Sequence, residues 1–276
     1  MLNVNTVKIG NYEVGSGKLA VIAGPCIAES MEICLEIASV MHKLCKERGI
    51  NYIFKASFDK ANRSSGESFR GLGMAHGFDV LKEVKRQFQI PVLTDVHEAG
   101  QAAAVAEVAD VLQIPAFLCR QTDLLTACGV TGKPVNVKKG QFMAPEDMKG
   151  AVKKLHLSGN YNVMLTERGA SFGYHNLVVD MRGLQTMRAF EVPVIFDATH
   201  SVQLPGGLGN SSGGQRQFIG ALSRAAAAVG IDGIFMEVHP NPQEALSDGP
   251  NSLDFAGAER TLDEVSAIYE LTRKML

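Results

Sequence analysis

The sequence predicts a (β/α)8 barrel, and three observations lead to that prediction. Short apolar or β-branched runs recur along the chain, and most are separated by stretches with helical periodicity or alanine-rich composition. Eight such runs begin about 30 residues apart, which is the length of a strand–helix unit. Several of them, such as Val194-Ile195-Phe196, are continuously apolar, as in strands covered on both faces. Eight units in roughly 250 residues fit a closed barrel better than an open sheet.

The expected strands and helices alternate in order along the chain. The strands are expected at residues 18–24, 52–56, 91–95, 111–114, 134–137, 163–166, 193–196 and 233–237. The clearest helices are expected at 31–48, 78–88, 99–108 and 215–229, with a terminal helix at 253–276. The helix after the fourth strand must be short, because little chain is left before the fifth strand. No linker or low-complexity tract interrupts the pattern, so residues 1–276 are expected to form one catalytic domain.

Residues before the first strand are expected to form a small β-hairpin. Short β-type runs at 6–9 and 12–14 flank Gly10-Asn11, a pair suited to a tight turn. We expect this hairpin to close the bottom of the barrel.

Composition and charge exclude several classes of protein. The chain has 27 Lys and Arg residues against 29 Asp and Glu residues, a net charge of -2, so no overall basic field exists to attract nucleic acid or an anionic membrane. No apolar run is long enough for a membrane span, and the first residues lack the features of a signal peptide. The 5 cysteines show no CxxC spacing, which argues against a disulfide framework. We therefore expect a cytoplasmic protein with no nucleic-acid or membrane partner.

Groups that can bind an anion, a metal or a proton follow every expected strand. In a (β/α)8 barrel the carboxyl ends of the strands converge on one rim, where active sites lie. Read in order, these groups are Cys26; Lys55, Ser57 and Lys60; Asp95 and His97; Gln113; Lys138 and Lys139; Glu167 and Arg168; Asp197 and His200; Glu237 and His239. Loops are often polar simply because they are solvated, but that explanation is weak when it must apply at all eight ends.

The cations among these groups predict a ligand with several negative charges. They are Lys55, Lys60, Arg63, Lys138 and Arg168. The segment KASFDKANRSS at 55–65 sets three of them among hydroxyl and amide side chains that fit closely around phosphate oxygens.

A second set offers ligands for a divalent transition metal. Cys26, His200, Glu237 and Asp248 come from the first, seventh and eighth units, which are neighbours in a closed barrel. A buried, unligated thiol is the commoner state of a cysteine, so the residues alone leave both readings of Cys26 open.

Long motifs in this chain resemble those of the 3-deoxy-D-manno-octulosonate 8-phosphate synthase family. The motifs are IAGPC, FKASFDKANRSS, LTDVHE, LQIPAFLCRQTDLL, NVKKGQF, ERGASFGYHNLVVDMR, FDATHSVQ and MEVHPNPQEALSDGP, and they cover residues 22–250 in the family's order. The resemblance implies a (β/α)8 barrel, usually a homotetramer, that condenses phosphoenolpyruvate with D-arabinose 5-phosphate and releases phosphate. The product enters the inner core of lipopolysaccharide.

The resemblance also implies roles for individual residues. Lys138 and Arg168 would hold the phosphate of phosphoenolpyruvate, and Lys55, Ser57, Lys60 and Gln113 would surround its carboxylate. Asn62, Arg63 and Ser64 would contact arabinose 5-phosphate, Asp95 would lie near the sugar, and Arg120 would reach into the site of a neighbouring subunit. The residues expected to take part directly in the reaction are Lys55, Lys60, Asp95, Lys138 and His200.

Cys26 separates two classes within that family. One class has Asn at this position and no metal, whereas the other binds a divalent ion with Cys, His, Glu and Asp. This chain has Cys26, His200, Glu237 and Asp248, so the resemblance implies the metal-dependent class. The ion is expected to be zinc, iron, manganese or cadmium.

Three alternatives stay open at the level of sequence. The related 3-deoxy-D-arabino-heptulosonate 7-phosphate synthases share the barrel and the metal set but use erythrose 4-phosphate, and they typically have a Lys-Pro-Arg-Thr type sequence where this chain has KANRSS. A Schiff-base aldolase would use Lys55 or Lys138 as its nucleophile. A binding protein without activity would leave the filled catalytic rim unexplained.

Overall fold

The computed structural model describes residues 4–62, 66, 69–207 and 212–275. Arg63 and Ser64, which sequence assigns to the sugar phosphate, lie outside these residues. No helix within the described ranges is both long and apolar enough to cross a membrane.

Within the described residues, eight parallel strands close into a barrel in the order β11-β14-β3-β4-β5-β6-β7-β8. The strands are β3 (Ala20–Gly24), β4 (Asn51–Lys55), β5 (Val92–Asp95), β6 (Val111–Ile114), β7 (Val135–Lys138), β8 (Val163–Glu167), β11 (Val194–Asp197) and β14 (Gly233–Glu237). Every residue of these strands is buried, as expected for strands that are covered on both faces. The predicted (β/α)8 barrel is therefore confirmed.

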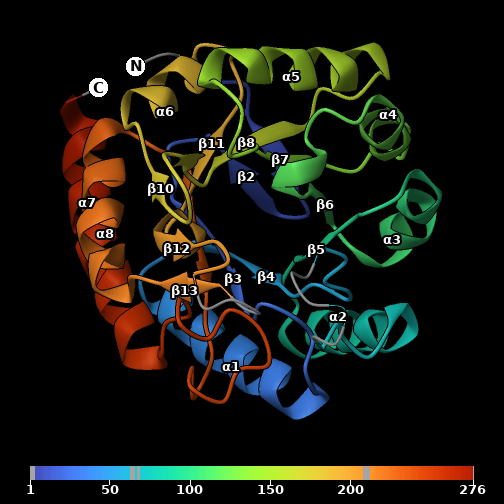
Figure 1. Cartoon of the computed structure of the whole chain (residues 1–276), viewed down its shortest axis with the longest axis vertical. Helices are drawn as coiled ribbons and strands as arrows, with labels where there is room; N and C mark the ends of the chain where they lie inside the picture. The colour runs from blue at the N-terminus through green and yellow to red at the C-terminus, as the bar shows by residue number, and fades with distance from the viewer. Residues whose placement is uncertain (1–3, 63–65, 67–68, 208–211, 276) are drawn as a thin grey trace.

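Helices surround the barrel on all sides (Figure 1). The α-helices of the described chain are α1 (Met31–Glu47), α2 (Met74–Phe88), α3 (Ala102–Val108), α4 (Thr122–Val130), α5 (Met148–Leu157), α6 (Arg182–Arg188), α7 (Ile219–Val229) and α8 (Phe255–Met275). The short α4 agrees with the prediction for the fourth unit. Ser30 caps α1, because its hydroxyl accepts a hydrogen bond from the Ile33 amide at 3.2 Å.

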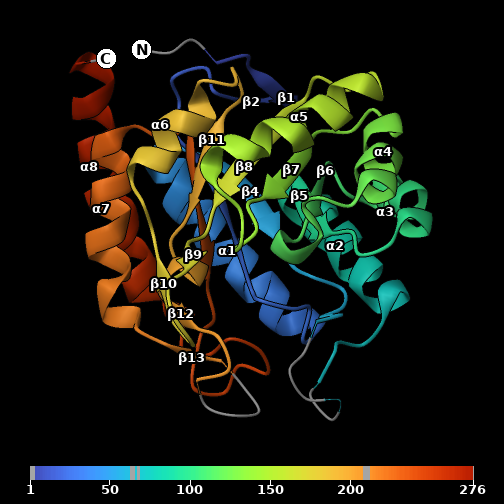
Figure 2. The ribbon, with the colours of Figure 1, turned by 45° about the horizontal axis from the view of Figure 1, so that its top comes forward.

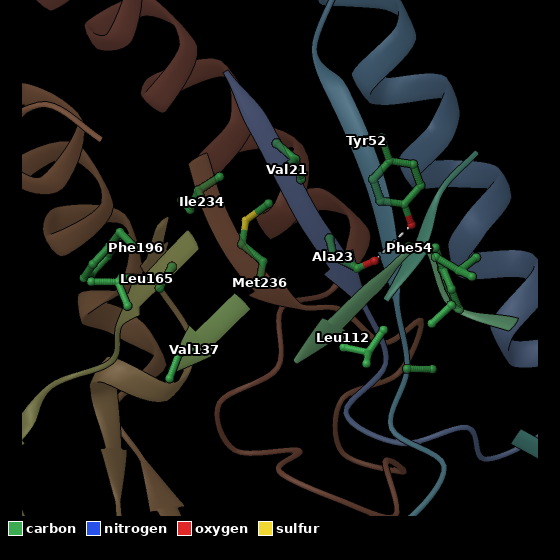
Figure 3. Close-up of a cluster of buried hydrophobic side chains, with 14 of the residues drawn as sticks. Val21, Ala23, Tyr52, Phe54, Leu112, Val137, Leu165, Phe196, Ile234 and Met236 are labelled. Atoms are coloured by element: carbon green, nitrogen blue, oxygen red, sulfur yellow. Dashed lines mark hydrogen bonds between the residues drawn. The ribbon is translucent and has the colours of Figure 1, made fainter. Parts of the chain in front are cut away.

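The main hydrophobic core lies between the barrel and the helices (Figure 3). Outward-facing strand residues such as Phe54, Leu165 and Phe196 pack in it against the apolar faces of the helices. Tyr52 is buried in the same layer, and its hydroxyl donates a hydrogen bond to the Ala23 carbonyl at 3.1 Å.

A second, smaller core fills the barrel beneath a hairpin of β1 (Val7–Ile9) and β2 (Tyr12–Val14). Val7, Ile9 and Val14 pack on inward-facing residues near the amino ends of the strands. Gly10 adopts φ 58° in the turn, where glycine is free of Cβ strain. The hairpin closes the barrel bottom as predicted, and the loops that follow the strands open at the opposite end (Figure 2).

Several predicted boundaries were wrong by a few residues. Helix α2 begins at Met74, four positions before the predicted start at residue 78, and α8 begins at Phe255 instead of 253. The predicted helices at 99–108 and 215–229 each begin with a 3-10 turn, at Ala99–Gln101 and Arg216–Phe218. The sequence also gave no sign of the two-residue strands in the rim loops, which are β9 (Ala170–Ser171), β10 (Leu177–Val178), β12 (Gln203–Leu204) and β13 (Gly213–Gly214).

Candidate active site

A cavity of about 620 Å³ lies at the carboxyl ends of the strands. The predicted site residues that line it are Lys55, Lys60, Asn62, Asp95, Gln113, Lys138, Arg168, His200 and Asp248. Cys26, Ser57 and Glu237 are buried directly behind this lining, where each contacts one of its members. The structure therefore brings residues from distant parts of the chain together around one cavity.

Three predicted phosphoenolpyruvate ligands are buried cations in this cavity. Lys55, Lys138 and Arg168 are only 1%, 6% and 5% exposed. The Lys138 ammonium donates to Asp197 at 2.6 Å, and the Lys55 ammonium donates to the Cys26 carbonyl at 2.7 Å. The buried Nη1 of Arg168 has no hydrogen-bond partner among the described residues, so it is available to an anionic ligand.

The ring of Phe235 forms the floor under the two lysines. Its centroid lies 3.8 Å from the Lys138 ammonium and 5.7 Å from the Lys55 ammonium. The His200 ring also packs against it, with the two ring centroids 5.7 Å apart. The negative face of a desolvated aromatic ring attracts cations, so Phe235 offsets part of the cost of burying two like charges together.

Burial and neighbouring charges shift the pKa values of these cations in different directions. Burial lowers the pKa of Lys138, and the carboxylate of Asp197 opposes that effect. Burial would also lower the pKa of Lys60, but the carboxylates of Glu237, Asp95 and Asp248 raise it above its ordinary value. Lys60 is therefore held as a cation in the cavity wall.

Asp95 is an ionised carboxylate in the wall of the cavity. Burial alone would raise its pKa, but Lys55, Lys60 and the Ser57 hydroxyl lower it well below the usual range. Ser57 donates a short hydrogen bond to one oxygen of Asp95, and the Gln113 amide donates to the other at 2.6 Å.

The four predicted metal ligands also meet. Ligand atoms of Cys26, Glu237 and Asp248 lie within 4.8 Å of one another. Nε2 of His200 lies 3.4 Å from Glu237 and 3.7 Å from Asp248. Oε2 of Glu237 is buried and has no hydrogen-bond partner among the described residues, which suits a carboxylate that ligates an ion. A thiol, an imidazole and two carboxylates form a donor set that fits a divalent transition metal.

The pKa values of the thiol and the imidazole in this set are both shifted from their ordinary values. Burial, with Glu237 and Asp248 nearby, raises the pKa of the Cys26 thiol far above its usual range. Burial would lower the pKa of His200, but the carboxylates of Asp197 and Glu237 raise it. By contrast, Cys34, Cys45 and Cys128 are buried in helices away from the cavity, as expected for apolar packing.

Two side chains to which the sequence assigned no role connect the cations to the predicted metal ligands. Asp197 accepts from Nδ1 of His200 at 2.8 Å while it pairs with Lys138, so it joins the lysine predicted to bind phosphate to the histidine predicted to bind metal. A carboxylate three residues before a ligand histidine is a recognisable orienting partner, and this signal could have identified Asp197.

Gln203 makes a similar connection on the other side of the cavity. Its carbonyl oxygen accepts from Arg168 at 3.0 Å, and its amide donates to Asp248 at 3.2 Å. Ser247 contacts only the predicted metal-ligand set, with its hydroxyl 2.8 Å from the sulfur of Cys26. Neither Gln203 nor Ser247 carries a signal in the sequence, because each depends on how the rim loops fold.

Arg120 does not line the central cavity of the described chain. It lies at a separate hollow of about 360 Å³ between the loops after β6 and β7, where its carbonyl oxygen accepts from Lys154 at 2.7 Å. The role that the resemblance implies for Arg120, in the site of a neighbouring subunit, stays a prediction.

Comparison with known proteins gives a consistent assignment. Residues 4–273 match the DAHP synthetase I family. Three similar proteins, all named 2-dehydro-3-deoxyphosphooctonate aldolase, come from Cyanothece sp. (59% identical; 94% of this chain and 95% of that protein), Fusobacterium nucleatum (58%; 94% and 94%) and Trichlorobacter lovleyi (57%; 97% and 98%). Since the match covers almost the whole barrel and every cavity residue described above, the chain belongs to the DAHP synthetase I family.

Proposed function

We propose that this protein condenses phosphoenolpyruvate with D-arabinose 5-phosphate and water, giving 3-deoxy-D-manno-octulosonate 8-phosphate and inorganic phosphate for the lipopolysaccharide inner core. The observation that carries the proposal is a single cavity with three buried cations, Lys55, Lys138 and Arg168, beside the ionised Asp95. The relatives' name denotes an eight-carbon keto acid phosphate, which contains the three carbons of phosphoenolpyruvate and five from a pentose.

Positioning and electrostatics supply most of the catalysis in this proposal. C3 of phosphoenolpyruvate attacks the aldehyde carbon, and water adds at C2 with loss of one proton. The C2–O bond to phosphate then breaks, phosphate leaves with the bonding electrons, and the hydroxyl that came from water loses its remaining proton to form the C2 ketone. Lys138 and Arg168 hold the phosphate, and Lys55 holds the carboxylate, which fixes the enol against the aldehyde. Lys60 stabilises the negative charge that develops on the aldehyde oxygen, which takes up a proton to become a hydroxyl.

The same proposal includes a divalent metal held by Cys26, His200, Glu237 and Asp248. When bound, a zinc, iron, manganese or cadmium ion would supply Lewis acidity to the site. Asp197 accepts the Nδ1 proton of His200, which leaves Nε2 free to act as a ligand.

The assembly and location that we propose are a homotetramer in the cytoplasm. Phe142 is 57% exposed and lines the same hollow as Arg120, and Phe117, on the same loop as Arg120, is 52% exposed. Exposed aromatic side chains beside an arginine are typical of protein interfaces, so a second copy of the chain is expected to cover them. Light scattering of the purified protein measures the oligomeric state directly.

Two other reactions are less well supported. A heptulosonate phosphate synthase would make a seven-carbon acid, whereas the relatives' names give an eight-carbon acid. A Schiff-base aldolase would leave a covalent adduct on Lys55 or Lys138 after borohydride treatment with substrate, and the proposed reaction leaves none.

Substrate choice is the decisive test of the proposed reaction. Phosphate release from phosphoenolpyruvate should be much faster with arabinose 5-phosphate than with erythrose 4-phosphate, and equal kcat/KM values for the two sugars would refute the assignment. Arg63→Ala should weaken the binding of arabinose 5-phosphate by roughly 1.5–3 kcal/mol, the range for a hydrogen bond to a charged group. The binding of phosphoenolpyruvate should be weakened less. If Arg63→Ala weakened the binding of both substrates equally, the assignment of Arg63 to the phosphate of arabinose 5-phosphate would be wrong.

A further inference from the structure

Five polar side chains form a continuous hydrogen-bonded row across five neighbouring units of the barrel. Ser57 donates to Asp95, Gln113 donates to Asp95 at 2.6 Å, Asn136 donates to Gln113 at 3.0 Å, and Thr166 donates to Asn136 at 2.8 Å. Asp95, Gln113, Asn136 and Thr166 lie on β5, β6, β7 and β8, which are adjacent strands. We call these five residues the polar row.

The polar row is buried along its whole length. Asp95 is 7% exposed and Gln113 is 1% exposed, whereas Ser57, Asn136 and Thr166 are not exposed at all. Asp95 and Gln113 line the cavity, but Asn136 and Thr166 are not among the described residues that line it. One end of the row therefore faces substrate, and the other end is hidden behind it.

The charge of Asp95 decides how every amide in the row is oriented. An ionised carboxylate can only accept hydrogen bonds, so Gln113 must turn its NH2 group toward Asp95 and its carbonyl oxygen toward Asn136. Asn136 must then present its own NH2 group to Gln113 and its oxygen to the next strand. Thr166 completes the sequence, because its hydroxyl donates to that oxygen.

This order of hydrogen bonds leaves one N–H donor of Gln113 available on the side that faces the cavity. One N–H of its amide binds Asp95, and its oxygen is satisfied by Asn136, so the second N–H remains for a ligand in the cavity. If the Gln113 amide were flipped, its oxygen would face the carboxylate of Asp95, and two buried hydrogen-bond acceptors would lie against each other without a proton between them. The arrangement favours an anionic group, such as a carboxylate, beside Gln113.

We infer that Asn136 and Thr166 are positioning residues for phosphoenolpyruvate, which act through Gln113 without touching substrate. The inference rests on the proposed function, because it assigns the carboxylate of phosphoenolpyruvate to the free N–H of Gln113. Thr166 holds Asn136, Asn136 holds Gln113, and Gln113 presents its N–H donor in one fixed orientation.

Thr166→Val tests the inference at the end of the row farthest from substrate. Valine has nearly the shape of threonine but removes the hydroxyl that orients Asn136, whereas Thr166→Ser keeps that hydroxyl. Thr94→Val is the matched control, because Thr94 is also fully buried in a barrel strand and its hydroxyl has no hydrogen-bond partner among the described residues. Phosphoenolpyruvate binding is measured by calorimetry, KM and kcat by phosphate release, and Tm by thermal unfolding.

Thr166→Val should bind phosphoenolpyruvate roughly three- to tenfold more weakly, the change expected from one neutral hydrogen bond. Its KM for phosphoenolpyruvate should rise by the same factor and more than its KM for the sugar. Thr166→Ser and Thr94→Val should bind as the wild type does.

The inference is overturned if Thr166→Val changes only Tm, or if Thr94→Val weakens phosphoenolpyruvate as much as Thr166→Val does. Failure of the proposed function is a separate result, because it appears in the wild type as absent turnover of phosphoenolpyruvate with arabinose 5-phosphate.

Discussion

The Lys138 ammonium lies 3.8 Å from the centre of the Phe235 ring, inside the closed barrel. The same ring lies 5.7 Å from the Lys55 ammonium, so one aromatic ring contacts two buried cations that come from different strands, β4 and β7. Each lysine also has a carboxylate partner, Asp197 for Lys138 and Glu237 for Lys55. Phe235 therefore helps to hold both ammonium groups where a trianionic substrate can meet them.

Phe235→Leu should weaken phosphoenolpyruvate binding while the barrel still folds. The substitution keeps an apolar side chain in the floor but removes the ring face, and a desolvated cation–π contact of roughly 1–2 kcal/mol corresponds to about five- to thirtyfold in affinity. The measurement is the KM for phosphoenolpyruvate together with direct binding.

Phe54→Leu is the control for that variant, since Phe54 is equally buried on a barrel strand but faces the helices. Both variants should lower Tm, because each removes buried atoms from a packed layer. Equal effects of the two on the KM for phosphoenolpyruvate would show that the ring serves packing alone.

The sequence predicted the barrel because its signal is repeated. Eight buried strands recur at similar spacing, so a misplaced boundary, such as the start of α2 at Met74, does not alter the fold. The boundary errors fall where local turns compete with helical periodicity, as in the 3-10 turn at Ala99–Gln101.

The site was predictable where residues follow strand ends, and less so elsewhere. Lys138 and His200 could be placed on one rim from topology alone. Phe235 could not, because it reads as an ordinary core residue of an apolar strand. Gln203 could not either, because its two partners meet only after three rim segments have folded together.

Gln203→Met should weaken both phosphoenolpyruvate and metal binding. The side chain accepts from Arg168 and donates to Asp248, and methionine keeps its volume but removes both hydrogen bonds. Each affinity should fall roughly three- to tenfold, as for the loss of one hydrogen bond on each side. Calorimetric titration with phosphoenolpyruvate and, separately, with zinc measures the two effects.

Gln185→Met is the matched control, because Gln185 bonds the Val229 carbonyl in the helix layer, away from the cavity. It should leave both affinities unchanged. If Gln203→Met affected neither ligand, the bridge between Arg168 and Asp248 would be incidental.

Metal removal should abolish the activity of the wild type, and a divalent transition ion should restore it. Cys26→Ala should resist restoration, because it removes one of four ligands. Cys26→Asn should retain partial activity that chelators do not affect, since Lys138 and Arg168 still hold phosphoenolpyruvate. Full activity of wild-type enzyme shown to be metal-free by elemental analysis would contradict the metal assignment.

Metal binding should release protons, and its affinity should rise with pH. In the metal-free protein, burial raises the pKa of Cys26, so this group is a neutral thiol at pH 7, and it must lose its proton to become a ligand. The pKa of His200 is also raised, mainly by Asp197 and Glu237 against the effect of burial, so part of the population must lose a second proton from Nε2. Protons and metal compete for the same two groups, and the affinity for metal therefore falls as pH is lowered.

Zinc titrations in buffers of different ionisation enthalpy should give a release of roughly one to two protons at pH 7. Cys26→Asn should release about one proton fewer, because an amide has none to lose. The same release from Cys26→Asn and the wild type would mean that the thiol is not a ligand.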